Sequence, residues 1–318
     1  MSARDRWPAR LHVVTGKGGT GKTTVAAALA LALAAGGRRT LLVEVEGRQG
    51  IAQLFGTGPL PYAERRVAGT GDRGEVRALA VDPEEALLEY LDMFYKLGMA
   101  GKALKKFGAI DFATTIAPGM RDVLLTGKVK EATTRTEAGH RVYDAVILDA
   151  PPTGRIGRFL NVTAETARLA KVGPIKTQSE GVAAFLRSPM TSVHVVTLLE
   201  EMPVQETTDA IAELTGLGIS VGRIVVNAVQ PPLLATGKPT QSELRKALVA
   251  AGLPADRETV AGLHTEARDY LTRREVEQGL RTELATLDRP TVELPHLPGG
   301  VDRAALDRFA ATLAAALR

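Results

Sequence analysis

The sequence contains no cysteine and no long apolar run. The absence of cysteine in 318 residues excludes disulfide bonds, thiolate zinc sites, cysteine-ligated iron–sulfur clusters and thiol nucleophiles. The longest apolar stretch, residues 25–36, is shorter than the ~20 residues that a membrane-spanning helix needs. The first ten residues lack the apolar core of a signal peptide. We therefore expect a cytoplasmic protein with no integral membrane segment and no bound zinc.

The sequence also lacks a large excess of charge of either sign. Forty Lys and Arg residues against 36 Asp and Glu give a net charge of +4, so the pI of 9.3 reflects a small surplus of basic residues. Lys96, Lys102, Lys105 and Lys106 form one local basic cluster, which is either the solvated face of a helix or an anion- or partner-binding surface. Because only Phe107 lies nearby as a stacking platform, we do not expect binding to nucleic acid.

The length and the 45% hydrophobic content suit one large α/β domain with a helical subdomain, and no linker divides the chain. Residues 57–74, which are rich in Gly and Pro, predict a loop connection. Residues 264–285 predict one long charged helix. Residues 303–318 predict an amphipathic helix, and because its residues are mostly alanine we expect it to dock on the protein's own sheet and not on a membrane.

The most informative stretch is TGKGGTGKTT at residues 15–24, which fits the phosphate-binding pattern G-x-x-x-x-G-K-[ST]. An apolar strand at residues 11–14 precedes it and a run of helix formers at residues 24–35 follows, as a phosphate loop requires. The glycines allow successive N–H groups to converge on phosphates. We expect Lys22 to contact the β- and γ-phosphates of ATP and Thr23 to bind Mg²⁺. The predicted nucleotide contacts of the loop are Gly16, Gly18, Gly19, Thr20, Gly21, Lys22, Thr23 and Thr24.

Two later features add acidic side chains at strand ends. Residues 143–149, YDAVILD, read as a buried strand that ends in Asp149, the Walker B arrangement in which the acid acts on Mg²⁺ through a bound water. Residues 40–46 predict another parallel strand, which carries Glu44 and Glu46 at its carboxyl end. Ligands of open α/β sheets bind at such strand ends.

These motifs together resemble the ArsA-like ATPases, a family of P-loop ATPases with a deviant Walker A loop, K-G-G-x-G-K-T-T. Lys17 stands at the position of the additional lysine of that loop. The residues after the Walker B strand are similar to the family's switch II, D-T-A-P-T-G-H-T-L-R-x-L, although Arg155 stands where the family has His. The resemblance covers most of the chain and implies a doubly wound, mostly parallel sheet in a single domain of residues 1–318, with helical subdomain segments at about 83–135 and 158–190. The matching switch II residues are Asp149, Pro152, Thr153, Gly154, Arg158 and Leu160.

The resemblance also implies roles for individual residues. Lys17 is expected to reach the nucleotide of a partner subunit, and Asp149 with Gly154 to sense the γ-phosphate. Glu46 is the candidate for positioning the attacking water where the family has Asp, or else it has only a structural role in a switch loop with slow or lost hydrolysis. The predicted catalytic residues are therefore Lys17, Lys22, Glu46 and Asp149. The predicted contacts with the adenine base are Asn227 and Pro298. Asn227 ends a predicted strand that follows the pair Glu206-Thr207, and both features are similar to the family.

The predicted function is an ATP-binding and ATP-hydrolysing dimeric switch that uses Mg²⁺ and acts on an unknown protein client. The dimer is formed either by two copies of the chain or with a paralogous ATPase. Two alternatives stay open, a non-hydrolysing regulatory subunit of a heterodimer and a ParA/MinD-like positioning ATPase. Met190 is the only methionine in the segment between switch II and the next strand, so a broad groove for a transmembrane helix is poorly supported.

Overall fold

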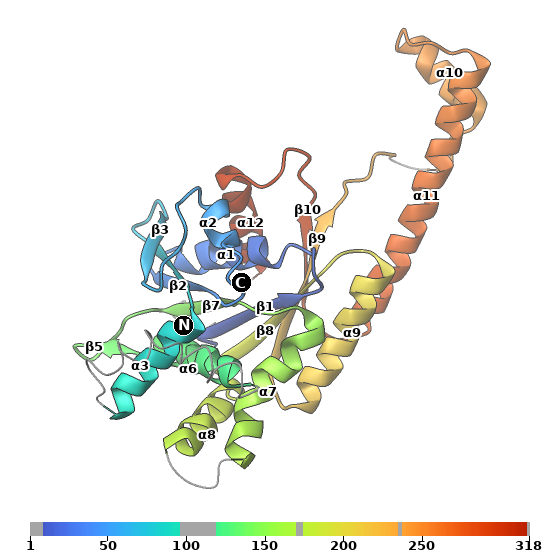
Figure 1. Cartoon of the computed structure of the whole chain (residues 1–318). Helices are drawn as coiled ribbons and strands as arrows, with labels where there is room; N and C mark the ends of the chain where they lie inside the picture. The colour runs from blue at the N-terminus through green and yellow to red at the C-terminus, as the bar shows by residue number, and fades with distance from the viewer. Residues whose placement is uncertain (1–8, 96–118, 170–173, 235–236, 317–318) are drawn as a thin grey trace.

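The computed structural model describes residues 9–95, 119–169, 174–234 and 237–316, and it shows one large sheet with helices on both faces (Figure 1). The sheet has eight strands in the order β10-β9-β8-β1-β7-β2-β4-β3. Neighbouring strands are parallel except for β3, which pairs antiparallel with β4. This confirms the predicted doubly wound, mostly parallel α/β fold.

The elements have the following bounds. The strands of the large sheet are β1 Leu11–Gly16, β2 Arg39–Glu44, β3 Arg65–Gly69, β4 Glu75–Ala80, β7 Ala145–Asp149, β8 Thr191–Thr197, β9 Val221–Val229 and β10 Thr291–Pro295, and a separate hairpin pairs β5 Thr136–Glu137 with β6 His140–Arg141. The helices are α1 Lys22–Ala34, α2 Gly50–Leu54, α3 Pro83–Tyr95, α6 Met120–Thr134, α7 Thr153–Leu169, α8 Pro174–Leu186, α9 Glu201–Gly216, α10 Gln241–Ala250, α11 Arg257–Ala285 and α12 Arg303–Ala316.

The central strands are apolar on both faces because helices cover both. In β2, Leu41 and Val43 face the layer that contains α6, α7 and α8, whereas Leu42 faces α1. In β7, Ile147 points to the α1 side and its neighbours to the other. This alternation follows the two-residue period of a strand, and full burial of one such side chain contributes about 1.5–3 kcal/mol.

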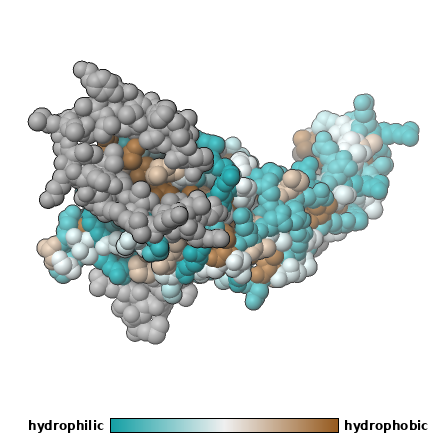
Figure 2. Space-filling model, turned by 60° about the horizontal axis from the view of Figure 1, so that its bottom comes forward, coloured by the Kyte–Doolittle hydropathy of each residue, from teal (hydrophilic) through white to brown (hydrophobic). Residues whose placement is uncertain are grey.

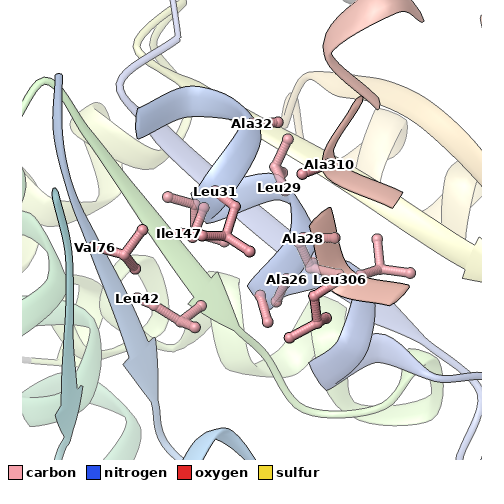
Figure 3. Close-up of a cluster of buried hydrophobic side chains, with 14 of the residues drawn as sticks. Ala26, Ala28, Leu29, Leu31, Ala32, Leu42, Val76, Ile147, Leu306 and Ala310 are labelled. Atoms are coloured by element: carbon pink, nitrogen blue, oxygen red, sulfur yellow. The ribbon is translucent and has the colours of Figure 1, made fainter. Parts of the chain in front are cut away.

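Helix α1 is buried on all sides. Its sequence, KTTVAAALALALA, is apolar around the whole circumference, which is typical of a helix enclosed by protein. Figure 3 shows Leu42 and Ile147 of the sheet on one side of α1, and Leu306 and Ala310 of α12 on another. The terminal helix therefore docks on the protein itself, as expected: it packs mainly against α1 and also contacts β10 of the sheet.

On the opposite face, α3, α6, α7 and α8 pack against one another. They fall within the segments predicted as a helical subdomain, except that α7 begins at Thr153, before the predicted start at about 158. The division into a subdomain stays a prediction. The basic cluster of Lys96, Lys102, Lys105 and Lys106 lies outside the described residues. In the ranges that the structure describes, no helix combines the length and the apolar composition that a bilayer span needs.

Two segments differ from the expectations. Residues 57–74, predicted as a loop connection, contain the edge strand β3, whose hairpin loop is closed by a backbone hydrogen bond from Thr70 to Gly74 (2.9 Å). The predicted helix at residues 264–285 begins at Arg257, because Asp256 caps it through the Thr259 N–H (3.0 Å).

The helices α10 and α11 form an arm that projects from the sheet edge (Figure 1). Helix α11 has 29 residues and is therefore about 43 Å long. Only its second half packs on the sheet, where Leu280 and Leu284 contact residues of β8 and β9. The surface of the arm is mainly hydrophilic, with separate apolar residues (Figure 2). Val249 and Leu253 of this part of the chain are exposed. No residue of α10 is buried.

Candidate active site

The glycine-rich loop lies at the centre of the carboxyl edge of the sheet. It connects β1 with α1, and β1 lies between β7 and β8. Val14 of β1 and Glu44 of β2 are both in register with Asp149 of β7, so the three strands end at the same level. The crevice at the carboxyl ends of parallel strands is the place where open α/β sheets bind ligands.

Two of the loop glycines are required by their surroundings. A Cβ on Gly16 would lie 2.2 Å from the carbonyl oxygen of Val196, and a Cβ on Gly21 would lie 2.3 Å from Nδ2 of Asn227. Gly21 also adopts a φ of +90°, a left-handed conformation that favours glycine, and it precedes α1 with no side chain capping the helix. The first N–H groups of α1 are therefore left for an anion.

The side chain of Lys22 lies inside the loop. Its Nζ is 3.4 Å from the carbonyl oxygen of Lys17, which also accepts hydrogen bonds from the N–H and the hydroxyl of Thr20 (3.3 and 2.9 Å). Burial lowers the pKa of Lys22, although the charges of Asp149 and Glu46 oppose this effect. An ammonium that is partly removed from water attracts the negative charge of a bound phosphate strongly.

Thr23 and Asp149 form the second part of the site. The hydroxyl of Thr23 donates a hydrogen bond to Oδ2 of Asp149 (2.7 Å). The other carboxylate oxygen, Oδ1, is buried and has no hydrogen-bond partner within the described part of the chain. Burial, together with the charges of Glu44 and Glu46, raises the pKa of Asp149 to about 6, although the Thr23 hydrogen bond and the charge of Lys22 oppose this effect.

This arrangement fits a hard divalent cation. A buried carboxylate oxygen without a partner and an adjacent hydroxyl offer oxygen ligands to a cation that also binds phosphates. Mg²⁺ prefers oxygen ligands and is bound in nucleotide sites through one or two protein groups together with phosphates. Thr23 and Asp149, the two predicted Mg²⁺ ligands, are therefore brought together in a form that suits the ion.

Glu44, the last residue of β2, and Glu46, which follows the strand, have different partners. Glu44 is buried, and its carboxylate accepts the backbone N–H groups of Gln49 (2.5 Å) and Ile51 (3.4 Å) at the start of α2. The carboxylate of Glu46 lies 3.7 Å from the guanidinium of Arg48 and, in the switch II segment, 3.9 Å from that of Arg155. The two departures from the family pattern, Glu46 and Arg155, are thus in contact with each other.

The predicted base contacts lie in different places. The side chain of Asn227 reaches the glycine-rich loop, where its Nδ2 donates a hydrogen bond to the carbonyl oxygen of Thr20 (2.9 Å). Pro298 lies in an exposed turn after β10, and no hydrogen bond or ion pair among the described residues joins that turn to the loop. Asn227 thus braces the loop backbone, and adenine binding by these two residues stays a prediction.

Gly154 and Thr24 complete the predicted set. Gly154 is exposed near the start of α7, and a Cβ there would meet no other atom within 4 Å. Thr24 is partly buried in the first turn of α1. Neither position excludes contact with a nucleotide, and no atom of the protein explains why position 154 is glycine.

Sequence reasoning missed two contacts that fix the site. Thr15 donates from its hydroxyl to the carbonyl oxygen of Pro151 (2.7 Å), which ties the loop to switch II. Glu206 on α9 accepts from Lys17 Nζ (2.5 Å) and from the Thr153 hydroxyl (2.7 Å). The only signal in the sequence was the Glu206-Thr207 pair itself, which does not indicate its partners.

The fold and this loop define a P-loop nucleoside triphosphatase. A sequence model of the anion-transporting ATPase family matches residues 9–182, more than half of the chain. The chain therefore belongs to this family, which confirms the resemblance to ArsA-like ATPases, and it is an ATPase.

Individual relatives agree with this assignment. The chain is 51% identical to ATPase BagA of Mycobacterium tuberculosis, over 97% of this chain and 95% of that protein. It is 27% identical to ATPase GET3 of Kluyveromyces lactis, over 71% of this chain and 72% of that protein. It is 26% identical to an arsenical pump-driving ATPase of Escherichia coli, over 81% of this chain and 44% of that protein.

Proposed function

We propose that the protein is an ATP-driven dimeric switch, in which binding of Mg-ATP closes two subunits against each other and hydrolysis relaxes them. The observation that carries the nucleotide site is the Thr23–Asp149 hydrogen bond of 2.7 Å beside the Nζ of Lys22, with Oδ1 of Asp149 left without a partner. A phosphate chain on the loop would lie beside the Lys22 ammonium, and Mg²⁺ held by Thr23 and Asp149 would separate the phosphates from the acid.

The residues of the chain would divide the work as follows. The N–H groups at the start of α1 and the ammonium of Lys22 bind the β- and γ-phosphates. Thr23 and Asp149 would hold Mg²⁺, which neutralises charge on the phosphate oxygens when it is bound. Glu46 would orient the attacking water, because its carboxylate belongs to the group of acids that surrounds Asp149.

The orientation of Lys17 supports a role in a dimer. Its carbonyl oxygen faces the inside of the loop, where it meets Lys22, but its side chain turns away to Glu206 and is about a third exposed. A cation at the rim of one site that is not needed inside it is available to a nucleotide in a facing subunit. We infer that Lys17 acts on the partner's nucleotide after ATP-dependent closure.

The loop, switch II and α7 would transmit the nucleotide state to a protein client. The hydroxyl of Thr15 connects the loop region to switch II through Pro151 (2.7 Å), and that of Thr153 connects switch II to Glu206 on α9 (2.7 Å). A change at the γ-phosphate would therefore reach α7, which begins at Thr153 and packs on α6, α8 and α9.

The test is the mass and compactness of the purified chain by light scattering and small-angle scattering, without nucleotide and with a non-hydrolysable ATP analogue and Mg²⁺. We expect a compact dimer only with the analogue for the wild type, and no such change for Lys17→Ala although it binds the analogue. Lys238→Ala, which removes an exposed lysine on the arm, should behave as the wild type. A scattering profile that does not respond to the analogue would contradict the proposal.

A further inference from the structure

The carboxylate of Glu206 joins two segments that the nucleotide must move. One oxygen, Oε1, lies 2.5 Å from Nζ of Lys17 in the glycine-rich loop. The other, Oε2, accepts a hydrogen bond of 2.7 Å from the hydroxyl of Thr153 at the start of α7. Both oxygens are thus engaged within one subunit, one by the glycine-rich loop and the other by the start of α7.

The partners of Glu206 make the contact a charged one. The Lys17 ammonium, followed by the Thr153 hydroxyl, holds the pKa of Glu206 below its usual range, so the carboxylate is ionised at neutral pH. Charge-assisted hydrogen bonds of this kind are shorter and stronger than neutral ones. The side chains of Lys17 and Glu206 are each 31% exposed, so solvent weakens the pair without removing it.

Glu206 itself is anchored. It lies in the second turn of α9, between Val204 and Thr207, which are buried in the face of this helix that packs on the sheet. The hydroxyl of Thr207 donates to the carbonyl oxygen of Pro203 (2.8 Å). Because the helix is fixed, a change in the Glu206 contacts requires movement of the loop lysine or of switch II, not of α9.

We propose that Glu206 is a positioning residue that holds Lys17 inside its own subunit until ATP draws the lysine away. This role rests on the proposed function, since it gives Lys17 a resting partner in the nucleotide-free state. Release of Lys17 leaves Thr153 as the sole partner of the carboxylate. Release of Lys17 therefore changes the contacts of the loop and of switch II together. When the dimer closes, Lys17 exchanges the carboxylate of Glu206 for the triphosphate of the facing subunit.

Replacement of Glu206 should strengthen the binding of ATP, whereas replacement of a residue that only helps catalysis should not. Because the Lys17–Glu206 pair must break before closure, its removal should favour the ATP-bound state. Loss of an ion pair at this exposure should make the affinity of Glu206→Gln for an ATP analogue tighter by about two- to five-fold. Glu201→Gln is the matched control, because Glu201 is an exposed acid in the first turn of the same helix.

The experiment uses two measurements on the full chain. The first is the rate at which an amine-acylating reagent modifies Lys17 in the nucleotide-free protein, measured by mass spectrometry, with Lys238 as the exposed reference. The second is the affinity for a β,γ-imido analogue of ATP with Mg²⁺, measured by calorimetry. In Glu206→Gln we expect acylation of Lys17 to be several-fold faster and the analogue to bind more tightly, whereas Glu201→Gln should match the wild type in both.

Two results would overturn the role of Glu206. One is an unchanged acylation rate of Lys17 in Glu206→Gln, which would show that the pair does not hold the lysine. The other is weaker or unchanged binding of the analogue, which would show that Glu206 supports the closed state or only the fold. A wild-type protein that binds no ATP analogue would overturn the proposed function and this role with it, whereas failure of Glu206→Gln alone leaves the ATP switch intact.

Discussion

The hydroxyl of Thr23 lies 2.7 Å from Oδ2 of Asp149, although 126 positions separate the two residues in the chain. Thr23 belongs to the first turn of α1, and Asp149 is the last residue of β7. The pairing depends on the strand order, which puts β7 directly beside β1. The site is therefore a product of the sheet topology, and its chemistry follows from a buried acid with one oxygen left open.

Replacement of Lys22 should weaken the binding of ATP and leave the fold unchanged. Lys22→Ala removes the only ammonium inside the loop and is expected to abolish or greatly weaken binding of ATP, measured by calorimetry. Because burial already disfavours the charged form of Lys22, we expect circular dichroism and the midpoint of thermal unfolding to change little. An unchanged affinity for ATP would contradict the assignment of the loop.

Replacement of Asp149 should stabilise the nucleotide-free fold. The pKa of Asp149 is raised to about 6, above the usual value of about 3.9 for an Asp side chain, so ionisation of this carboxyl opposes folding at neutral pH. Asp149→Asn keeps an oxygen for Thr23 and removes the buried charge, and we expect a gain of about 1–3 kcal/mol in the free energy of unfolding at pH 7.5. ATPase activity should be lost at the same time.

Urea unfolding without nucleotide and without metal checks this gain. Asp209→Asn is the control, because Asp209 is exposed on α9 and should give a change near zero. A less stable Asp149→Asn protein would show that the charge of Asp149 is compensated in the nucleotide-free state.

A stacked histidine pair in the sheet predicts a loss of stability in acid. Nδ1 of His12 lies 3.1 Å from Nε2 of His194, and burial lowers the pKa of His12 to about 4 and that of His194 well below its usual value. The unfolded chain binds protons on these residues below about pH 6.5, whereas the folded protein does not. The free energy of unfolding should therefore fall as the pH is lowered from about 6.5 to 4, by about 3 kcal/mol from His12 alone.

Chemical denaturation at a series of pH values measures this loss. The near-isosteric double variant His12→Phe/His194→Phe should show a flatter dependence on pH between 4 and 6.5. His296→Gln should keep the slope of the wild type, since His296 is exposed. Equal slopes in all three proteins would assign the acid sensitivity to other groups.

The absence of cysteine predicts the behaviour towards metals. Soft As(III) and Sb(III) ions prefer thiolate ligands, and the described residues contain no group of three or more His, Asp and Glu side chains that could hold a metal ion. We expect no stoichiometric zinc by elemental analysis and no stimulation of the ATPase by arsenite or antimonite. A clear rise in turnover with antimonite would mean that side chains other than thiolates form such a site.

The sequence predicted the parts of the molecule whose signals are local. The strand, loop and helix around Lys22 follow from an apolar run, glycines and helix formers that are contiguous, and the acid at Asp149 follows from the end of a buried strand. Helix α10 also had a local signal that was missed, since Thr240 and Glu243 form a capping box. Strand β3 had none, because it is an exposed edge strand in which only Ala68 is buried.

The contacts between distant segments could not be predicted in the same way. The role of Glu206 depends on how α9 lies relative to the loop and to Thr153, and a pattern within α9 carries no such information. The start of α11 was placed too late because its charged residues surround the whole helix and give it no apolar face. Likewise, the pairing of Glu46 with Arg155 depends on how β2 and β7 are placed in the sheet.

If Lys17 of one subunit completes the nucleotide site of the other, two variants that are inactive alone should restore activity when they are mixed. Lys17→Ala retains its own phosphate loop but lacks the lysine for its partner, whereas Lys22→Ala lacks a working loop but still supplies Lys17. We expect each variant alone to show almost no ATP turnover, and an equimolar mixture to regain turnover in the sites where a Lys17→Ala loop meets Lys17 of a Lys22→Ala subunit. A mixture as inactive as its components would contradict the account, because it would show that Lys17 acts within its own subunit.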